Sequence, residues 1–180
     1  MKRLFFILPV IAFAGLAAFL GFGLTQDPKE LPSQLIDRPL PEFSLPGIAD
    51  EPGGGPGLVS ASFRGEPRLL NVWASWCAAC PQEHPVLERI AAEGFPVYGI
   101  AWKDKPEDSR AFLARYGNPY SGMGADFPGR TAIDLGVTGA PETFVVDKKG
   151  RVRFKQVGPI SPEIWESQIK PMMLQLQAEA

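Results

Sequence analysis

Residues 71–85 read NVWASWCAACPQEHP, and this stretch holds both cysteines of the chain, Cys77 and Cys80. The run that leads into it, residues 68–73 (RLLNVW), is mostly apolar and is typical of a strand buried on both faces. Residues 80–93 carry apolar side chains at helical spacing. The Cys-x-x-Cys pair is therefore expected between a buried strand and the first turn of a helix.

A dithiol at a helix N-terminus is suited to disulfide exchange. The partial positive charge of the helix end stabilises a thiolate at Cys77. That thiolate can attack a disulfide in another molecule, and Cys80 can then attack the mixed disulfide and release the reduced product. The pattern thus favours Cys77 and Cys80 as the catalytic residues and as the two ends of a redox-active disulfide.

The spacing of the two cysteines also allows three weaker interpretations. Two cysteines can fall three positions apart by chance. They can also form half of a metal site, but only His84 is left to complete one, so we expect no metal. The pattern C-x-x-C-H attaches c-type haem, but Pro81 stands where that pattern needs histidine, so the chain is not expected to carry its own haem.

Alternating strands and helices are expected on both sides of this centre. A first short strand is expected near Phe43 and Leu45. The other expected strands cover residues 58–63, 95–102, 142–147 and 151–157, the last two forming a hairpin. The expected helices cover residues 106–116 and 162–177. This order predicts an α/β sandwich with a mixed sheet flanked by helices.

Length and charge narrow the class of protein further. The 180 residues allow one domain of about 150 residues with a single core. There are 18 Lys and Arg residues against 20 Asp and Glu residues, which gives a net charge of −2. Since no basic run is long enough to grip phosphates, nucleic acid is not an expected partner.

The N-terminus (residues 1–24) has the composition of a membrane anchor. Lys2 and Arg3 precede residues 4–24, which carry no charge and as a helix would span about 30 Å, the thickness of the bilayer's hydrocarbon core. The basic pair favours a cytoplasmic N-terminus and an exported remainder; a cleaved signal peptide is the rival interpretation. Residues 25–41 are polar and proline-rich and are expected to form a linker to a folded domain at 42–180.

The stretch 71–85 resembles the active-site segment of thioredoxin-fold proteins. Two further segments, 117–120 (GNPY) and 134–144 (DLGVTGAPETF), make the chain similar to the membrane-anchored thiol:disulfide interchange proteins of cytochrome c maturation, the CcmG/DsbE type. The resemblance implies a thioredoxin-like fold with an added N-terminal β-hairpin and an N-terminal transmembrane anchor.

The resemblance also implies a substrate-binding segment beside the dithiol. Pro141 matches the family's cis-proline, and cis peptide bonds are a proline speciality. The backbone of Ala140 would pair there with an extended substrate peptide. Ala140, Pro141 and Thr143 are therefore expected to bind substrate.

Five further residues are expected to modulate the dithiol: Trp76, Pro81, Glu83, Asn71 and Glu142. The two glutamates match acidic positions near the family's dithiol, where a carboxylate disfavours the thiolate and keeps the pair a reductant. Either one can also take the proton from the second cysteine. Asn71 departs from many thioredoxins, which carry a buried Asp there, and Asn cannot ionise. Trp76 is expected at the surface around the first cysteine.

Taken together, the resemblance implies a disulfide reductase on the periplasmic side of the bacterial inner membrane, single-pass and anchored through residues 4–24. Its substrate would be apocytochrome c or another exported protein disulfide, and a membrane electron donor would re-reduce it. No haem, metal or nucleotide cofactor is expected, because the two thiols carry the electrons. A thiol oxidant, an apocytochrome-binding module without redox turnover and, more weakly, a copper-delivery protein are the alternatives.

Overall fold

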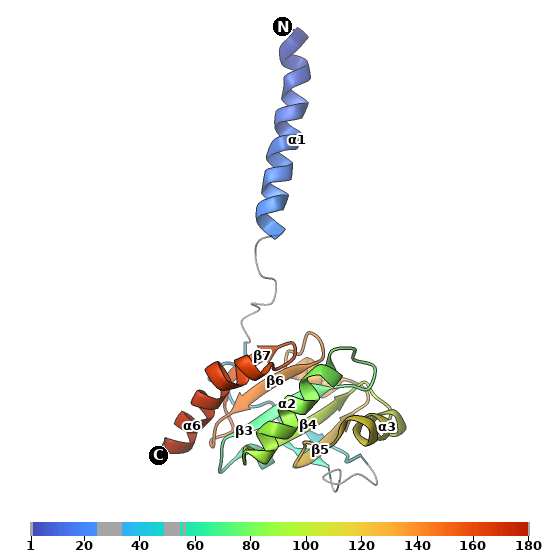
Figure 1. The fold of residues 1–180 in the computed structure, drawn as a ribbon, viewed down its shortest axis with the longest axis vertical. Coiled ribbons are helices and arrows are strands. Elements are labelled where there is room, and N and C mark those ends of the chain that lie inside the picture. Colours follow the sequence, from blue (N-terminus) through green and yellow to red (C-terminus); the bar gives the residue numbers. More distant parts are fainter. Residues whose placement is uncertain (1, 25–33, 49–54, 56, 180) are drawn as a thin grey trace. The chain divides into compact units, whose positions relative to one another are not determined.

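In the computed structural model, the Cys-x-x-Cys segment leaves the middle strand of a sheet with the order β5-β4-β3-β6-β7 (Figure 1). The middle strand, β3 (Arg68–Trp73), is parallel to β4 (Val97–Trp102), which is parallel to β5 (Gly122–Asp126). On the other side, β6 (Glu142–Val146) runs antiparallel to β3 and to β7 (Val152–Val157). The mixed sheet expected from the sequence is confirmed.

The structure describes residues 2–24, 34–48, 55 and 57–179. The chain forms two compact units, Met1–Pro32 and Ser33–Ala180. The first contains α1 (Lys2–Leu24), whose side chains are described over residues 7–22. Among the described residues, no helix is both long enough and apolar enough to cross a membrane.

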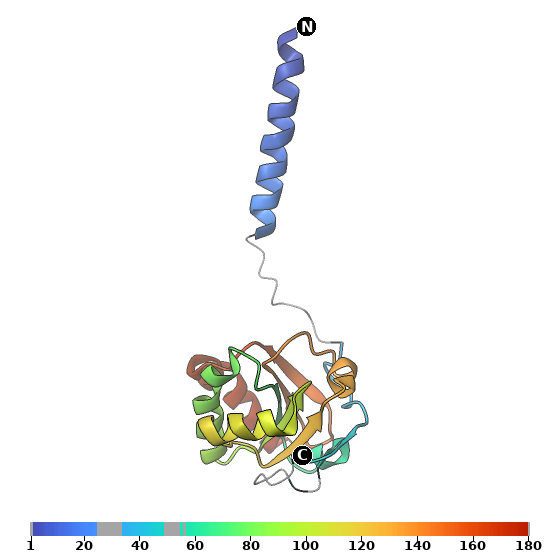
Figure 2. The ribbon, with the colours of Figure 1, turned by 90° about the vertical axis from the view of Figure 1, so that its right-hand side faces the viewer.

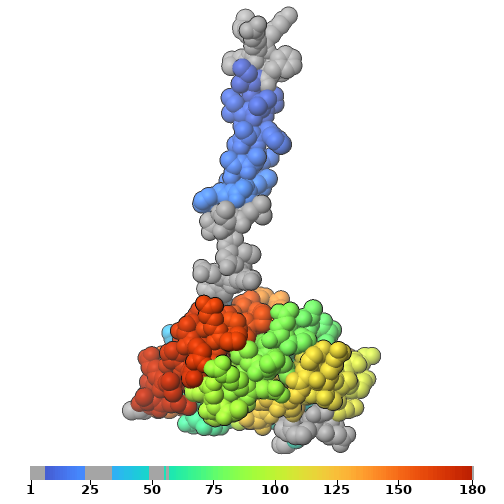
Figure 3. All heavy atoms as spheres, in the orientation of Figure 1, coloured from blue at the N-terminus to red at the C-terminus, as the bar shows by residue number. Residues whose placement is uncertain are grey.

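Helices cover both faces of the sheet (Figures 1 and 2). One face carries α2 (Cys80–Ala92), α3 (Pro106–Tyr116) and a C-terminal segment made of α5 (Pro162–Ile164), the π-helical turn η2 (Trp165–Ile169) and α6 (Lys170–Ala178). Figure 3 shows α2 between α3 and the C-terminal segment on this face. The other face carries α4 (Arg130–Asp134), the 3₁₀ turn η1 (Ser60–Phe63) and the short antiparallel pair β1 (Ser44–Leu45) and β2 (Leu58–Val59).

The alternation of side chains along β3 decides what lies under α2. Leu69 and Trp73 enter the core on the α2 face, whereas Leu70 and Val72 enter the core on the α4 face. Because successive side chains of a strand point to opposite faces, Asn71 lies on the α2 face with Leu69 and Trp73. This places an amide under the helix that begins with Cys80.

Two elements were not predicted, β5 and α4. β5 reads GMGAD, with two glycines and no β-branched residue, so its composition argues against a strand. Gly124 is needed because β1 and β2 cross closely over β5: a Cβ at this position would lie 2.7 Å from the Cβ of Leu45. The expected strand 58–63 is also too long, since it turns into η1 after Val59 and buries Phe63.

The predicted linker extends too far into the domain. Its residues 25–33 lie outside the described residues, but the segment that follows them is hydrogen-bonded to the first residue of β7 and to the turn before it. The backbone N–H of Asp37 donates to the carbonyl of Val152 at 2.7 Å, and that of Leu40 donates to the carbonyl of Gly150 at 2.9 Å. The Arg153 guanidinium pairs with the Asp37 carboxylate at 3.0 Å. These bonds make residues 34–40 part of the folded domain.

Candidate active site

Cys77 and Cys80 form a disulfide at the start of α2, with their Cα atoms 5.5 Å apart. Cys80 is fully buried, whereas Cys77 is 5% exposed. The backbone N–H of Cys80 donates to Sγ of Cys77 at 3.1 Å. In the reduced state this N–H and the helix N-terminus stabilise a thiolate on Cys77. Pro81 occupies the first helical turn, where its missing N–H costs no hydrogen bond.

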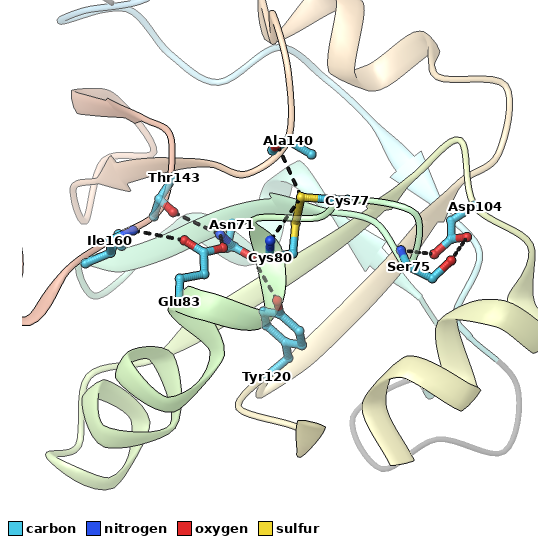
Figure 4. Close-up of a disulfide and its surroundings, with 10 residues drawn as sticks. All are labelled: Asn71, Ser75, Cys77, Cys80, Glu83, Asp104, Tyr120, Ala140, Thr143 and Ile160. Carbon is cyan, nitrogen blue, oxygen red and sulfur yellow. Dashed lines mark hydrogen bonds between the residues drawn. A yellow bond between two sulfur atoms is a disulfide. The ribbon is translucent and has the colours of Figure 1, made fainter. Parts of the chain in front are cut away.

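The loop before β6 lies at the sulfur of Cys77 (Figure 4). The Ala140–Pro141 peptide bond is cis, as the resemblance implied. The carbonyl oxygen of Ala140 lies 3.3 Å from Sγ of Cys77. Thr143, which was expected to bind substrate, is fully buried instead, because its position on β6 turns it inward beneath α2.

Behind the disulfide, Asn71 connects three elements through hydrogen bonds (Figure 4). It pairs directly with Thr143 across β3 and β6, and its Nδ2 donates to Thr143 Oγ1 at 3.0 Å. The same nitrogen donates to Glu83 Oε1 at 2.9 Å, while Tyr120 donates from its hydroxyl to Asn71 Oδ1 at 2.8 Å. The backbone N–H of Ile160 completes the cluster by donating to Glu83 Oε2 at 3.1 Å.

Glu83 is the buried acid of this cluster, with 1% of its surface exposed. Burial raises the pKa of its carboxyl to about 7, because a low-dielectric interior disfavours the charged form. The hydrogen bonds from Asn71 and from the Ile160 backbone oppose this shift of the pKa but do not cancel it. Among the described residues no cation pairs with Glu83, so the carboxyl is poised to gain or lose a proton near neutral pH.

Glu142 lies on the opposite face of the sheet from Glu83. It pairs with Val72, a residue of the α4-side core, whereas its neighbour Thr143 faces α2. Its carboxylate accepts hydrogen bonds from the backbone N–H of Thr138 at 3.0 Å and from the Thr138 hydroxyl at 2.5 Å. Lys155 Nζ lies 2.8 Å from the second oxygen. The two glutamates that the sequence placed together at the dithiol are therefore separated by the sheet.

Trp76 is 55% exposed and forms part of the surface beside the first cysteine, as expected. Its indole N–H donates to the carbonyl of Lys103 at 3.1 Å, and its ring lies 5.6 Å from that of Trp102. On this side of the disulfide an open cleft of about 550 Å³ runs between the dithiol loop and α3. The cleft is lined by Ser75, Trp76, Cys77, Ala78 and Pro81 together with Asp108, Ala111, Phe112, Arg115 and Tyr116.

Tyr120 and Asp104 were not singled out from the sequence. Tyr120 stacks on Trp73 with the ring centroids 5.6 Å apart, and burial raises its pKa well above the ordinary value. The stack fits because Gly99 leaves room, since a Cβ there would lie 2.9 Å from the tyrosine ring. Asp104 is buried and binds Ser75, two residues before Cys77. The GNPY segment was the sequence signal that could have identified Tyr120. No motif in the sequence pointed to Asp104.

A mixed sheet with a dithiol at the end of its middle strand, opposite a cis-proline, defines a thioredoxin-like thiol:disulfide oxidoreductase. The family model named Redoxin matches residues 36–171. The chain is 45% identical over 172 residues to the thiol:disulfide interchange protein DsbE of Allochromatium vinosum, covering 95% of this chain and 93% of that protein. It is 39% identical over 187 residues to DsbE of Escherichia coli K12, covering 100% and 99% of the two chains. The chain belongs to the Redoxin family and, within it, to the DsbE thiol:disulfide interchange proteins.

Solved structures share this fold. A secreted thiol-disulfide isomerase from Corynebacterium glutamicum matches with a TM-score of 0.67 and 25% identity, covering 86% of this chain and 96% of that chain. A thio-disulfide isomerase from Thermus thermophilus matches with a TM-score of 0.59 and 31% identity, covering 81% and 99%. These structures agree with the thioredoxin-like arrangement of sheet and helices described above.

Proposed function

We propose that this chain is a membrane-tethered periplasmic reductase that keeps the haem-binding cysteines of apocytochrome c as thiols before haem attaches. One observation carries the proposal: a sulfur near the surface, Cys77, is combined with a buried carboxyl, Glu83, whose pKa is about 7. The sulfur can reach a target disulfide, and the carboxyl can exchange a proton near neutral pH. The resemblance to cytochrome c maturation proteins suggests the target.

The proposed reaction is a two-step exchange. The Cys77 thiolate attacks one sulfur of the target disulfide, and the other target sulfur leaves as a thiolate. Cys80 then loses its proton and attacks the Cys77 sulfur of the mixed disulfide, which releases the second target thiol. Two electrons pass from the dithiol to the target, and the chain ends with the Cys77–Cys80 disulfide that the structure contains. A membrane electron donor would reduce this disulfide again; no haem, metal or nucleotide takes part.

Glu83 is the proposed proton acceptor for the second step. It follows Cys80 by one turn of α2 and is held by Asn71, which cannot ionise itself. The ionised carboxylate takes the proton of the Cys80 thiol, and protonated Glu83 returns it to a leaving thiolate. A carboxyl buried without a cation also disfavours a neighbouring thiolate, which favours the reductant over the rival oxidant.

Glu142 receives a different role in the proposal. Its hydrogen bonds hold Thr138 and Gly139, which lead directly into Ala140 and Pro141. Glu142 therefore positions the segment on which an extended substrate would lie, and the backbone of Ala140 would pair with that substrate. The cleft between Trp76 and α3 would receive the residues on the other side of the target cysteine.

The tether is the remaining part of the proposal. Lys2 and Arg3 before the uncharged residues 4–24 support a single-pass anchor in the inner membrane, with the domain on the periplasmic side. An anchored domain stays close to a donor in the same membrane, so re-reduction does not depend on three-dimensional diffusion.

The proposal is tested with the full-length chain and an apocytochrome c whose haem-binding cysteines form a disulfide. We expect the wild type to reduce it, Cys80→Ala to accumulate a mixed disulfide through Cys77, and Cys77→Ala to form no adduct. A reduction potential of the Cys77–Cys80 couple between about −270 and −200 mV would support the reductase. A potential near about −120 mV would indicate the oxidant. If Cys80→Ala kept full function in cells, the binding module without redox turnover would replace the reductase.

A further inference from the structure

Asp104 lies two residues after the end of β4, next to the loop that carries the dithiol (Figure 4). β3 and β4 are parallel neighbours, so their C-terminal ends meet at one edge of the sheet. The chain leaves β3 at Trp73 toward Cys77 and leaves β4 at Trp102 toward Asp104. The topology therefore brings a carboxylate from the second loop against the backbone of the first.

The carboxylate of Asp104 accepts three hydrogen bonds from two parts of the site. Its Oδ2 accepts the backbone N–H of Ser75 at 2.8 Å, and its Oδ1 accepts the Ser75 hydroxyl at 2.6 Å. Oδ2 also accepts the hydroxyl of Ser109, in α3, at 2.9 Å. Asp104 is 3% exposed, and among the described residues no cation pairs with it. Burying a carboxylate is costly unless hydrogen bonds compensate, and here the donors come from the dithiol loop and from α3.

The residue before Asp104 supports the same loop. Lys103 has a φ of 48°, in the left-handed region that non-glycine residues rarely adopt. In this conformation its N–H donates to the carbonyl of Asp126 at 2.9 Å, and its own carbonyl accepts the indole N–H of Trp76 at 3.1 Å. Lys103 and Asp104 together thus bind both residues that precede Cys77.

We propose that Asp104 is a positioning residue for Cys77: by fixing Ser75 it holds the turn that keeps the Cys77 sulfur at the backbone N–H of Cys80. The Cys77 thiolate depends on this contact, since Sγ lies 3.1 Å from that nitrogen. Without the carboxylate, the Ser75 N–H loses its acceptor, and the turn is no longer connected through Asp104 to Ser109 of α3. The thiolate is then less stabilised, so a smaller fraction of the Cys77 thiol is ionised at pH 7 and its alkylation slows.

The test measures how fast iodoacetamide alkylates Cys77 in the reduced full-length protein at pH 7, with peptide mapping to separate the two cysteines. We expect Asp104→Ala to slow the reaction about tenfold, as for the loss of a hydrogen bond to a charged acceptor. Asp104→Asn keeps an acceptor for the Ser75 N–H and should recover to within about twofold of the wild type. Glu107→Ala removes the same charge from an exposed position nearby and should change nothing.

Two outcomes would overturn the inference. The first is a wild-type alkylation rate in Asp104→Ala together with a lowered melting temperature, which would make the residue structural only. The second is an Asn variant as slow as the Ala variant. If Asp104→Ala does not fold, Ser75→Ala removes only the hydroxyl contact and should slow the reaction about twofold to threefold; a wild-type rate there would also contradict it.

The inference rests on the proposed nucleophilic role of Cys77, and the same assay separates the two. A wild-type protein alkylated at Cys80 instead of Cys77 would contradict the proposed function. A wild-type protein alkylated at Cys77, with variants that do not differ from it, would contradict only the role of Asp104. Alkylation needs neither a cytochrome nor an electron donor, so an error in the proposed substrate leaves the result intact.

Discussion

Glu83 and Glu142 are both buried, on opposite faces of the central sheet, but their surroundings differ in one respect. Glu83 accepts hydrogen bonds from neutral donors, the Asn71 amide and the Ile160 backbone. Glu142 has the Lys155 ammonium 2.8 Å away. The pKa of Glu83 rises to about 7, because burial without a nearby cation favours the neutral acid. Burial thus leaves a carboxyl that can exchange a proton near neutral pH on one face and an ion-paired carboxylate on the other.

Removing the cation from Glu142 should give the largest effect. Lys155→Met leaves a buried carboxylate without its ion-pair partner, which typically costs about 3–5 kcal/mol. Urea denaturation at pH 7 would measure the loss in the free energy of unfolding. Lys149→Met, at an exposed position of the same hairpin, is the matched control and should change stability by less than about 0.5 kcal/mol. A loss below about 1 kcal/mol for Lys155→Met would show that the pair does not anchor the loop.

Glu83 should make the stability of the domain depend on pH. Its pKa is about 7 in the folded state against 4.5 for the ordinary group, so between these values the folded state binds more protons than the unfolded state. The free energy of unfolding should therefore fall as pH rises through this window, by about 3 kcal/mol in total. Glu83→Gln should lack this fall when both proteins are unfolded by urea from pH 4 to pH 8. An identical slope in both proteins would assign the pH dependence to other groups.

Removing a hydrogen bond to Glu83 should raise its pKa further and so increase its difference from the ion-paired Glu142. The Asn71 amide lowers the pKa of Glu83, so Asn71→Ala should raise that pKa by about one unit, equivalent to about 1.4 kcal/mol. Carboxyl chemical shifts followed by NMR against pH would show the change. Thr143→Val is the control, because Thr143 contacts the amide while the bond from the amide to Glu83 remains. A lower or unchanged pKa in Asn71→Ala would contradict the expectation.

A glutamate at the surface should give the smallest loss in the free energy of unfolding. Glu166 is paired with Arg89 and Lys170 on the helical surface, where its side chain is 43% exposed. Water screens such pairs, so Glu166→Gln should reduce the free energy of unfolding by less than about 1 kcal/mol. Thermal unfolding in low and in high salt would test this, since the small loss should shrink further as salt rises. A loss as large as that of Lys155→Met would show that exposure does not separate these carboxylates.

The strands and helices next to the dithiol could be predicted because their signals are local. The expected strand 68–73 and helix 106–116 have the observed bounds, since apolar periodicity defines both. β5 could not be predicted, because Gly124 is required by the close passage of β1 rather than by any local preference for a strand. The extent of the linker was wrong for a similar reason: residues 34–40 are held by hydrogen bonds to residues 150–152, more than a hundred positions further along the chain.

The site was predictable in composition but not in arrangement. The cysteines, the cis-proline and the presence of Glu83 follow from motifs. Whether Glu142 faces α2 or the opposite side of the sheet depends on the alternation along β6 and on its register against β3, where Asn71 meets Thr143. Local patterns carry no information about a pairing between residues 72 positions apart. The inward direction of Thr143 and the separation of Glu142 from Glu83 therefore could not be predicted from local sequence patterns.

The same long-range pairings decide when the dithiol acquires its chemistry. Glu83 depends on a hydrogen bond from Ile160, 77 positions later, and Asn71 depends on a strand that follows it by almost the same distance. Contacts of such separation form late in folding, because the chain loses much entropy in closing the intervening loop. A chain emerging from synthesis therefore presents Cys77 and Cys80 as ordinary flexible thiols. The buried carboxyl of Glu83 gains its hydrogen-bond partner at Ile160 only when the last third of the domain has folded.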